Sequence, residues 1–180
     1  IKQDAIPGFI NTAWTIVDKP GTYRGKCTEL CGKNHAFMPI VVKVVPQDEY
    51  DAWVRNKKEE AFKMAELTEK NWTAEELTQR GEGVYQKNCV ACHRVNGQGL
   101  TGIFPALAGS DIVLNNKAKH IEILMEGVQG AAMQSFSNQL SEVDMASVIT
   151  YTRQAWGNAQ DGDGQIVVPK DIVEYKEPKA

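Results

Sequence analysis

The four cysteines of this chain stand in two close pairs, Cys27 with Cys31 and Cys89 with Cys92. A histidine follows each pair within four residues. The scattered cysteines of a disulfide framework are typical of small secreted domains. Thiols and imidazoles this close together are instead typical ligands of a metal or cofactor. We therefore expect two separate metal or cofactor sites.

The second pair forms the run Cys89-Val90-Ala91-Cys92-His93, which matches the C-x-x-C-H pattern of covalent haem attachment. Two thiols three positions apart on a helical turn can add to the two vinyl groups of one porphyrin, and the adjacent imidazole then reaches the iron. A zinc site would need a second pair of ligands nearby, and a thioredoxin-like dithiol would need a surrounding βαβ pattern. The sequence has neither, so a c-type haem is the favoured interpretation.

The surroundings of this motif resemble class I bacterial cytochromes c. The motif ends a predicted helix and is followed by a glycine-bearing loop that leads to Phe104, Pro105 and Ala106. In that family the backbone carbonyl of a proline at this place accepts a hydrogen bond from the histidine that ligates the iron. The resemblance therefore implies this role for Pro105, with His93 as the iron ligand and an all-α domain around them.

The sixth iron ligand is inferred among three methionines and one histidine. Met125 and Met145 lie inside helical patterns, where methionine is usually a core residue, and His120 beside Lys119 at a helix start is expected to be exposed. Met133 lies in the loop between the last two predicted helices, where the family carries its axial methionine. A thioether opposite an imidazole raises the potential and leaves no open site on the iron. We therefore expect electron transfer without a substrate site and without catalytic residues.

The first pair belongs to the more specific run C-T-E-L-C-G-K-N-H-A-F-M, from Cys27 to Met38. It places two thiols, an imidazole and a thioether within twelve residues, directly before a β-branched segment. Soft sulfur ligands combined with imidazole select copper. A disulfide between Cys27 and Cys31, with His35 and Met38 incidental, is the alternative for a chain handled without copper.

This run resembles the binuclear copper (CuA) motif of cytochrome c oxidase subunit II. In that family two cysteinates bridge the copper ions, a glutamate between them ligates through its backbone carbonyl, and a histidine and a methionine follow. The resemblance therefore implies copper ligation by Cys27, Glu29, Cys31, His35 and Met38. The family also uses a second histidine on an earlier strand, and no histidine precedes the motif here. We expect an incomplete site that binds copper weakly.

The elements around the two motifs predict four parts. Turn signals at Pro7-Gly8 and Pro20-Gly21, and the β-branched run from Ile40 to Val45, indicate about four short strands, which we expect to be poorly ordered or repacked. A charged segment of helix formers follows. The predicted parts are a partial cupredoxin-like CuA segment (residues 1–46), a charged helical linker (47–70), a cytochrome c domain (71–157) and a polar tail with little fold-defining structure (158–180).

Three helices are predicted in the cytochrome c part. Thr73 with Glu76 is typical of a capping box that opens the first, which should end near Asn88. The second should run from Asn116 to Gly127. The third should begin at the start signal of Ser141 and Asp144 and stop at Gly157-Asn158.

These resemblances imply a multi-domain fold, a truncated cupredoxin-like β segment followed by an all-α class I cytochrome c domain. They also imply that the family's two membrane helices and first strands precede the chain in an intact subunit II, at the periplasmic face of the bacterial inner membrane. The implied partners are the oxidase catalytic subunit, other oxidase subunits and a cytochrome c donor. The formal charge of -3 is spread without a basic stripe, which gives nucleic acid no electrostatic basis for binding.

Two other functions remain open. A free-standing periplasmic cytochrome c with a vestigial copper segment would bind haem but no copper. A CuA-containing reductase of nitrogen oxides would share the copper motif. The order of copper segment, linker and cytochrome c favours the oxidase.

Overall fold

The structure is a computed structural model that describes residues 2–176. Residue 1 and residues 177–180, the outer ends of the predicted cupredoxin-like segment and of the predicted tail, lie outside the described residues. The chain divides into two compact units, Ile1–Glu60 and Ala61–Ala180.

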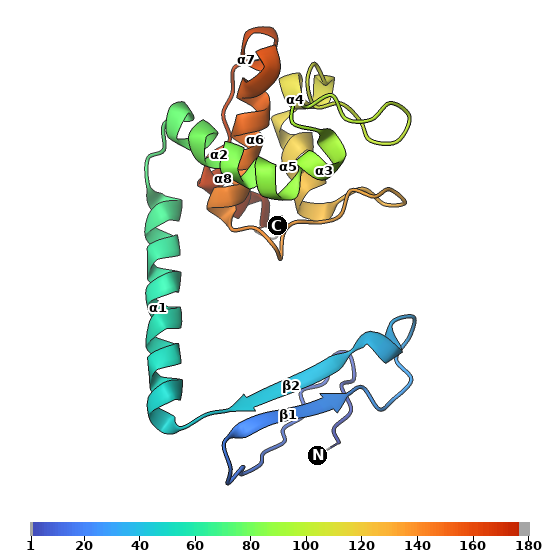
Figure 1. Ribbon diagram of the computed structural model, residues 1–180, viewed down its shortest axis with the longest axis vertical. Helices are drawn as coiled ribbons and strands as arrows, with labels where there is room; N and C mark the ends of the chain where they lie inside the picture. The colour runs from blue at the N-terminus through green and yellow to red at the C-terminus, as the bar shows by residue number, and fades with distance from the viewer. Residues whose placement is uncertain (1, 177–180) are drawn as a thin grey trace. The chain divides into compact units, whose positions relative to one another are not determined.

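The first unit is built on a two-stranded antiparallel sheet (Figure 1). Strand β1 (Gly21–Lys26) pairs with β2 (Pro39–Val44) over the whole length of both strands. The loop that joins them holds the first cysteine pair and a short 3-10 turn, η1 (His35–Phe37). The register brings the two ends of the cysteine motif to the same end of the sheet.

About four strands were expected before Pro46, and the described part of the chain forms two. A strand needs a neighbour that supplies hydrogen bonds across the ladder. The backbone groups of residues 2–20 pair only locally, as when the Phe9 N–H donates to the Ile6 carbonyl at 3.1 Å. They therefore run as turns and extended chain rather than as strands.

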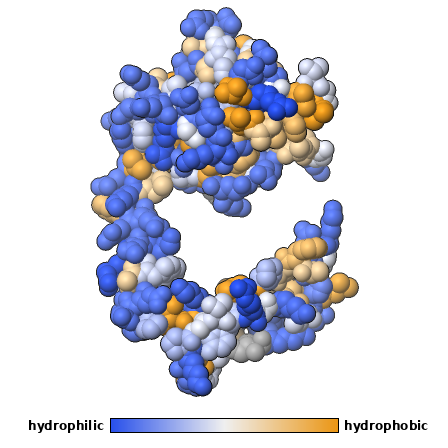
Figure 2. Space-filling view, viewed as in Figure 1, coloured by the Kyte–Doolittle hydropathy of each residue, from blue (hydrophilic) through white to orange (hydrophobic). Residues whose placement is uncertain are grey.

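No residue between positions 2 and 60 is buried. The apolar side chains of Ile40, Val41 and Val42 are 50–54% exposed, and apolar groups are visible on the surface of this unit (Figure 2). A lone two-stranded sheet is at best marginally stable in water. The first unit thus has no hydrophobic core of its own among these residues.

The charged segment forms one long helix, α1 (Gln47–Glu69), which begins in the first unit and ends in the second. Asp48 and Glu49 lie in its first turn, where negative charge complements the helix dipole. Across residues 2–176, we find no helix with both the length and the hydrophobicity needed to cross a lipid bilayer.

The second unit is organised by two helices, α2 (Ala74–Asn88) and α6 (Glu142–Gln154), which cross in Figure 1 and pack together. The predicted capping box is confirmed, since Thr73 and Glu76 exchange hydrogen bonds at the start of α2. Helix α6 is buried on nearly all sides, and every residue from Met145 to Arg153 is buried. Further helices that contact α6 cover the sides that α2 leaves open.

The second predicted helix and the start of the third are also confirmed, but the third ends at Gln154 instead of Gly157-Asn158, because the backbone of Ala155 is extended (φ -76°, ψ 163°). Asn116 caps α5 (Lys117–Glu126), which ends at Gly127, and Ser141 caps α6. Four short elements complete the frame: α3 (Val90–His93), α4 (Asp111–Asn115), η2 (Ala155–Gly157) and α7 (Asn158–Asp161).

The prediction of little structure after residue 157 is wrong for the described part of that segment. A further helix, α8 (Pro169–Lys176), packs on α6, and Val167 and Ile172 are fully buried. The Thr150 hydroxyl donates to the Val167 carbonyl at 2.8 Å and anchors the segment. The physical reason is that α6 is apolar on more sides than the other predicted helices can cover.

Candidate metal centres

The C-terminal end of α2 delivers the second cysteine pair. Cys89 ends α2 and its N–H still donates to the Tyr85 carbonyl at 2.9 Å. The Cys89 carbonyl then accepts from the N–H of Cys92 at 3.2 Å and from that of His93 at 2.9 Å. The two thiols and the imidazole are therefore held on one helical turn. Burial raises the pKa of the Cys89 thiol to about 11, so this thiol stays protonated near neutral pH.

The loop after the motif orients the imidazole. The Nδ1 atom of His93 lies 3.0 Å from the carbonyl oxygen of Pro105, close enough for an Nδ1–H to donate to it. Gly99 allows this approach, because a Cβ there would lie 2.3 Å from the Phe104 oxygen and 2.5 Å from that of Pro105. Its φ of +62° also favours glycine. With Nδ1 bonded to the carbonyl, Nε2 is the nitrogen left to bind iron.

Two aromatic side chains hold the backbone just beyond the motif. The Tyr85 hydroxyl donates to the Arg94 carbonyl at 2.6 Å, and the Trp156 indole N–H donates to the Val95 carbonyl at 3.2 Å. The two rings pack with centroids 5.2 Å apart. Tyr85 comes from α2 and Trp156 from η2, so elements far apart in sequence hold the backbone that follows His93.

A cavity of about 360 Å³ opens beside the motif, a size typical of cofactor pockets. Its walls are mostly apolar and include the five residues that the sequence assigned to haem: Cys89, Cys92, His93, Pro105 and Met133.

The Met133 loop is tied to the end of α5. The Met133 carbonyl accepts from the Val128 N–H at 2.9 Å, and the Phe136 N–H donates to the Leu124 carbonyl at 2.9 Å. A cavity with two thiols, an imidazole and a thioether within apolar walls has the donor set that a c-type haem requires.

The expectation that His120 is exposed is wrong. Its side chain is buried, with 8% of the residue exposed, and it lines the same cavity. The sequence contained one sign of this burial. His120 lies four positions before the buried Leu124, so the two residues share a face of the helix. Met125 and Met145 are core residues, as predicted.

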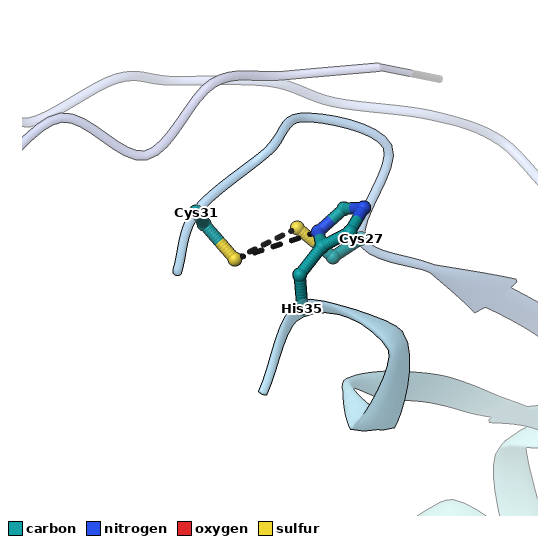
Figure 3. A group of neighbouring side chains, drawn as sticks. All are labelled: Cys27, Cys31 and His35. Atoms are coloured by element: carbon teal, nitrogen blue, oxygen red, sulfur yellow. Dashed lines mark hydrogen bonds between the residues drawn. The ribbon is translucent and has the colours of Figure 1, made fainter. Parts of the chain in front are cut away.

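The first cysteine motif gathers four sulfur and nitrogen donors in the β1–β2 loop. The Sγ atoms of Cys27 and Cys31 lie 3.4 Å apart, and Cys31 Sγ lies 3.6 Å from the Nδ1 atom of His35 (Figure 3). The Met38 sulfur lies 3.2 Å from Cys31 Sγ. The Glu29 carbonyl oxygen, the fifth expected ligand, lies 3.2 Å from Cys27 Sγ. All five predicted copper ligands thus come together.

This donor set suits copper. The atoms of Cys27, Cys31 and His35 that could bind a metal lie within 4.8 Å of one another, and no second group of this kind occurs between residues 2 and 176. The hydrogen bond with Cys27 raises the pKa of the Cys31 thiol. Metal binding would therefore displace a proton from this pair.

Two protein families match successive parts of the chain. Residues 1–45 match the family described as "Cytochrome C oxidase subunit II, periplasmic domain". Residues 76–151 match the family described as "Cytochrome C oxidase, cbb3-type, subunit III". The first match implies copper and the second implies haem. The predicted order of a cupredoxin-like β segment and an all-α cytochrome c domain is confirmed.

Relatives that are named as cytochrome c oxidase subunit 2 match either most of this chain or about a third of it. A cytochrome c oxidase subunit 2 of Alkalihalophilus pseudofirmus is 34% identical over 162 residues, which are 84% of this chain and 44% of that protein. A probable subunit 2 of Rickettsia felis is 52% identical over 61 residues, 34% of this chain and 19% of that protein. The Arabidopsis thaliana subunit 2 is 49% identical over 57 residues, 32% of this chain and 22% of that protein.

This chain spans less than half the length of each of these relatives. The match to Alkalihalophilus pseudofirmus extends over most of this chain, whereas the matches to Rickettsia felis and Arabidopsis thaliana cover about a third of it. Residues 1–45 thus resemble the periplasmic domain of cytochrome c oxidase subunit II, and residues 76–151 of the same chain resemble a cytochrome c domain.

Proposed function

We propose that this chain is an electron-relay component of a respiratory haem-copper oxidase. It accepts an electron from a cytochrome c donor at the haem site and delivers it through the copper site to the oxygen-reducing subunit. The observation that supports this most strongly is the presence, in one chain, of two donor sets suited to one-electron metals. The chain contributes to the oxidase without a substrate site of its own.

At the haem site each residue has a separate task. Cys89 and Cys92 would hold the porphyrin by thioether bonds, and His93 and Met133 would ligate its iron. When bound, haem supplies a reversible one-electron couple. The bond between His93 Nδ1 and the Pro105 carbonyl keeps the imidazole in one orientation and makes it a stronger ligand. The apolar walls exclude water from the iron.

At the copper site the ligands would be the thiolates of Cys27 and Cys31, the Glu29 carbonyl, the His35 imidazole and the Met38 thioether. Cysteine and methionine sulfur favour cuprous as well as cupric ions, which suits a site that must change oxidation state. No histidine lies between Ile1 and Cys27, so residues 1–46 alone supply only the five ligands named above. We therefore propose that residues 1–46 by themselves bind copper weakly.

The proposed location is the periplasmic face of the bacterial inner membrane. The family matched by residues 1–45 is itself described as a periplasmic domain. The proposed partners are the catalytic and other subunits of the oxidase, together with a soluble or membrane-bound cytochrome c that supplies electrons.

The test is a rapid-mixing experiment on the oxidase that contains this chain. Reduced cytochrome c is mixed with the oxidised complex while the haem and copper absorption bands are followed separately. We expect the haem of this chain to be reduced first and the copper centre next. In Cys31→Ser the haem should still be reduced, but it should stay reduced, while in His93→Ala neither step should occur.

Copper reduction that precedes haem reduction would contradict the proposed order. Haem with no copper in the intact complex would indicate a cytochrome c with a vestigial copper segment. Catalytic turnover with nitrogen oxides in place of oxygen would indicate a reductase.

A further inference from the structure

Helix α8 has no task in the function proposed above. It lies beyond residue 151, where the family match of the cytochrome c part ends, and yet it packs on both α5 and α6. Those two helices are joined by residues 127–141, the loop that carries Met133. Helix α8 therefore bridges the two elements between which the proposed axial ligand is held.

Two consecutive side chains near the end of α8 reach the two ends of this loop. The Tyr175 hydroxyl donates a hydrogen bond to the carboxylate of Glu126, the last residue of α5. The Lys176 ammonium lies 2.6 Å from a carboxylate oxygen of Glu142, the first residue of α6. The residues that flank the loop on either side are thus both bound to α8.

These two bonds are present at neutral pH. The hydrogen bond with Glu126 raises the pKa of Tyr175 to about 12, so the phenol remains a donor. The hydrogen bond with Lys176 lowers the pKa of Glu142, so this carboxylate remains charged. Hydrogen bonds in which one partner is ionised are stronger than those between neutral groups.

Helix α8 can hold the loop because it is itself fixed to the domain. Ile172 and Val167 are fully buried, and the Val167 N–H donates to the Thr150 hydroxyl at 2.9 Å. The Asp171 carboxylate lies 2.8 Å from the ammonium of Lys117, the first residue of α5.

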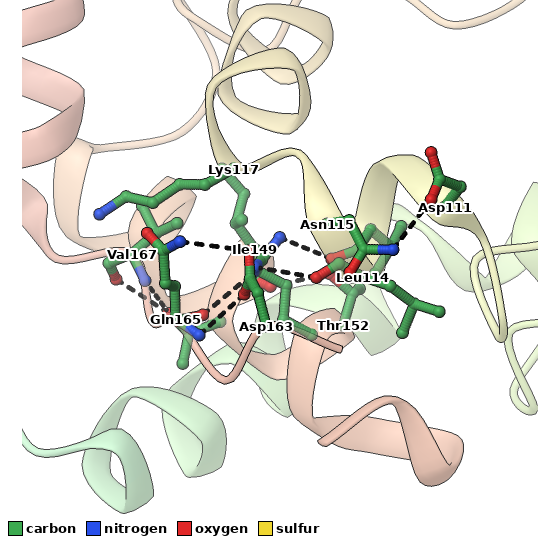
Figure 4. Close-up of polar contacts among 12 residues, drawn as sticks. Asp111, Leu114, Asn115, Lys117, Ile149, Thr152, Asp163, Gln165 and Val167 are labelled. Atoms are coloured by element: carbon green, nitrogen blue, oxygen red, sulfur yellow. Dashed lines mark hydrogen bonds and ion pairs between the residues drawn. The ribbon is translucent and has the colours of Figure 1, made fainter. Parts of the chain in front are cut away.

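The segment that leads into α8 is anchored as well (Figure 4). The Asp163 N–H donates to the Leu114 carbonyl at 3.1 Å, and the Gln165 carbonyl accepts from the Arg153 guanidinium at 2.9 Å. Arg153 is 4% exposed, so this anchor lies inside the domain.

The end of α5 is in direct contact with the backbone of the proposed ligand. Gly127 follows Glu126, and a Cβ at Gly127 would lie 2.7 Å from the Met133 carbonyl oxygen. The next N–H, of Val128, donates to the same oxygen at 2.9 Å. Residues 129–132, on the other side of this contact, are exposed. A shift of Glu126 would therefore shift Met133.

We infer that Tyr175 and Lys176 are positioning residues for the axial ligand, because they hold both ends of its loop and so keep the Met133 sulfur at the iron. This inference rests on the proposed haem site and goes beyond the ligands themselves. When the two bonds are removed, the loop should open more often, and another ligand could then reach the iron. Helix α8 thus favours electron transfer over ligand exchange.

The experiment uses the haem-loaded full chain in the ferric state at neutral pH, with imidazole as the probe. Imidazole binds the iron only after Met133 has left it, so its apparent dissociation constant reports the population of the open loop. The readouts are the red absorption band that a methionine sulfur gives with ferric haem, followed during titration with imidazole, and the melting temperature.

Tyr175→Phe and Lys176→Met each remove one bond, the double variant removes both, and Lys176→Arg keeps the cation. Lys170→Met is the matched control, because Lys170 also lies on α8 but pairs with Glu69, at the end of α1, away from the loop.

We expect the double variant to bind imidazole about three- to tenfold more tightly than the unaltered chain, with a smaller gain in each single variant. Lys176→Arg and Lys170→Met should bind imidazole as the unaltered chain does. Without imidazole, every variant should retain the methionine band.

An unchanged imidazole affinity in the double variant would overturn the inference even if its melting temperature fell, because α8 would then serve stability alone. An equal gain in Lys170→Met would overturn it as well. An unaltered ferric chain without the methionine band would contradict the proposed ligation by Met133, and a chain without haem would contradict the proposed function.

Discussion

The crossing of α2 and α6 depends on one residue without a side chain. Gly81 lies where the two helices meet, and a Cβ built there would be 2.0 Å from the Ser147 carbonyl oxygen and 2.5 Å from its carbon. Real Cβ atoms essentially never approach closer than 3.0 Å. Because the obstacle is backbone, no rotamer change can relieve the contact. Gly81→Ala should therefore push the helices apart.

The same helix offers a matched control. Gly83 lies two positions later in α2, and a Cβ there would meet nothing within 4 Å. Alanine is about 1 kcal/mol more favourable than glycine inside a helix, so Gly83→Ala should stabilise the domain by up to that amount. Gly81→Ala gains the same helix propensity, but the steric overlap of its methyl group costs about 3 kcal/mol of stability. The domain should therefore lose about 2 kcal/mol in total.

The difference between the two variants is then about 3 kcal/mol. For a unit of this size that corresponds to roughly 12 °C in melting temperature. Thermal unfolding of the two variants by circular dichroism would measure it. Haem content must be equal in both samples, because a bound ligand stabilises the folded state. A Gly81→Ala variant as stable as Gly83→Ala would refute the packing argument.

Three further predictions follow from single contacts. Asn158→Ala should destabilise the second unit by about 2–4 kcal/mol in urea unfolding, because this buried amide bonds three backbone groups that would lose their partner. The Lys176 ammonium lowers the pKa of Glu142, so their interaction is complete above the carboxyl's usual pKa of 4.5 and is lost as the pH falls through the lowered value. Glu142→Gln should therefore weaken the fall of melting temperature in acid, and an unchanged slope would contradict this. Cys31→Ser should abolish copper uptake while haem content stays the same, as measured by metal analysis and haem absorption.

The sequence predicted those elements whose signals are local. The capping box at Thr73, the N-caps at Asn116 and Ser141 and the end of α5 at Gly127 all appear where expected. Each signal lies within about four residues of the helix end that it defines, so no knowledge of the fold was needed. The five residues assigned to haem also line one cavity, although the sequence alone could not show their separation in space.

The features that were missed depend on contacts between distant parts of the chain. Helix α8 begins with Pro169, a favoured first residue of helices, but its stability comes from Ile172 packing on α6. His120 was expected to be exposed because it follows Lys119 at the start of a predicted helix. Its side chain lines the cavity, whose other walls come from distant parts of the chain. The packing of Ile172 on α6 cannot be read from a local pattern, whereas the spacing of His120 and Leu124 was a local sign that His120 is buried.

The proposed copper ligands raise a different question, because no residue between positions 2 and 60 of the unit that holds them is buried. The Cys27 N–H donates to the Met38 carbonyl at 3.2 Å, so the first and last ligands of the motif are joined by an extension of the β1–β2 ladder. A metal bound to both residues would close the same loop that the ladder closes, and the two would stabilise each other. Since a hairpin without a core is marginal, the order of this unit and its affinity for copper must be coupled. The register of β1 and β2 is therefore part of the proposed copper site.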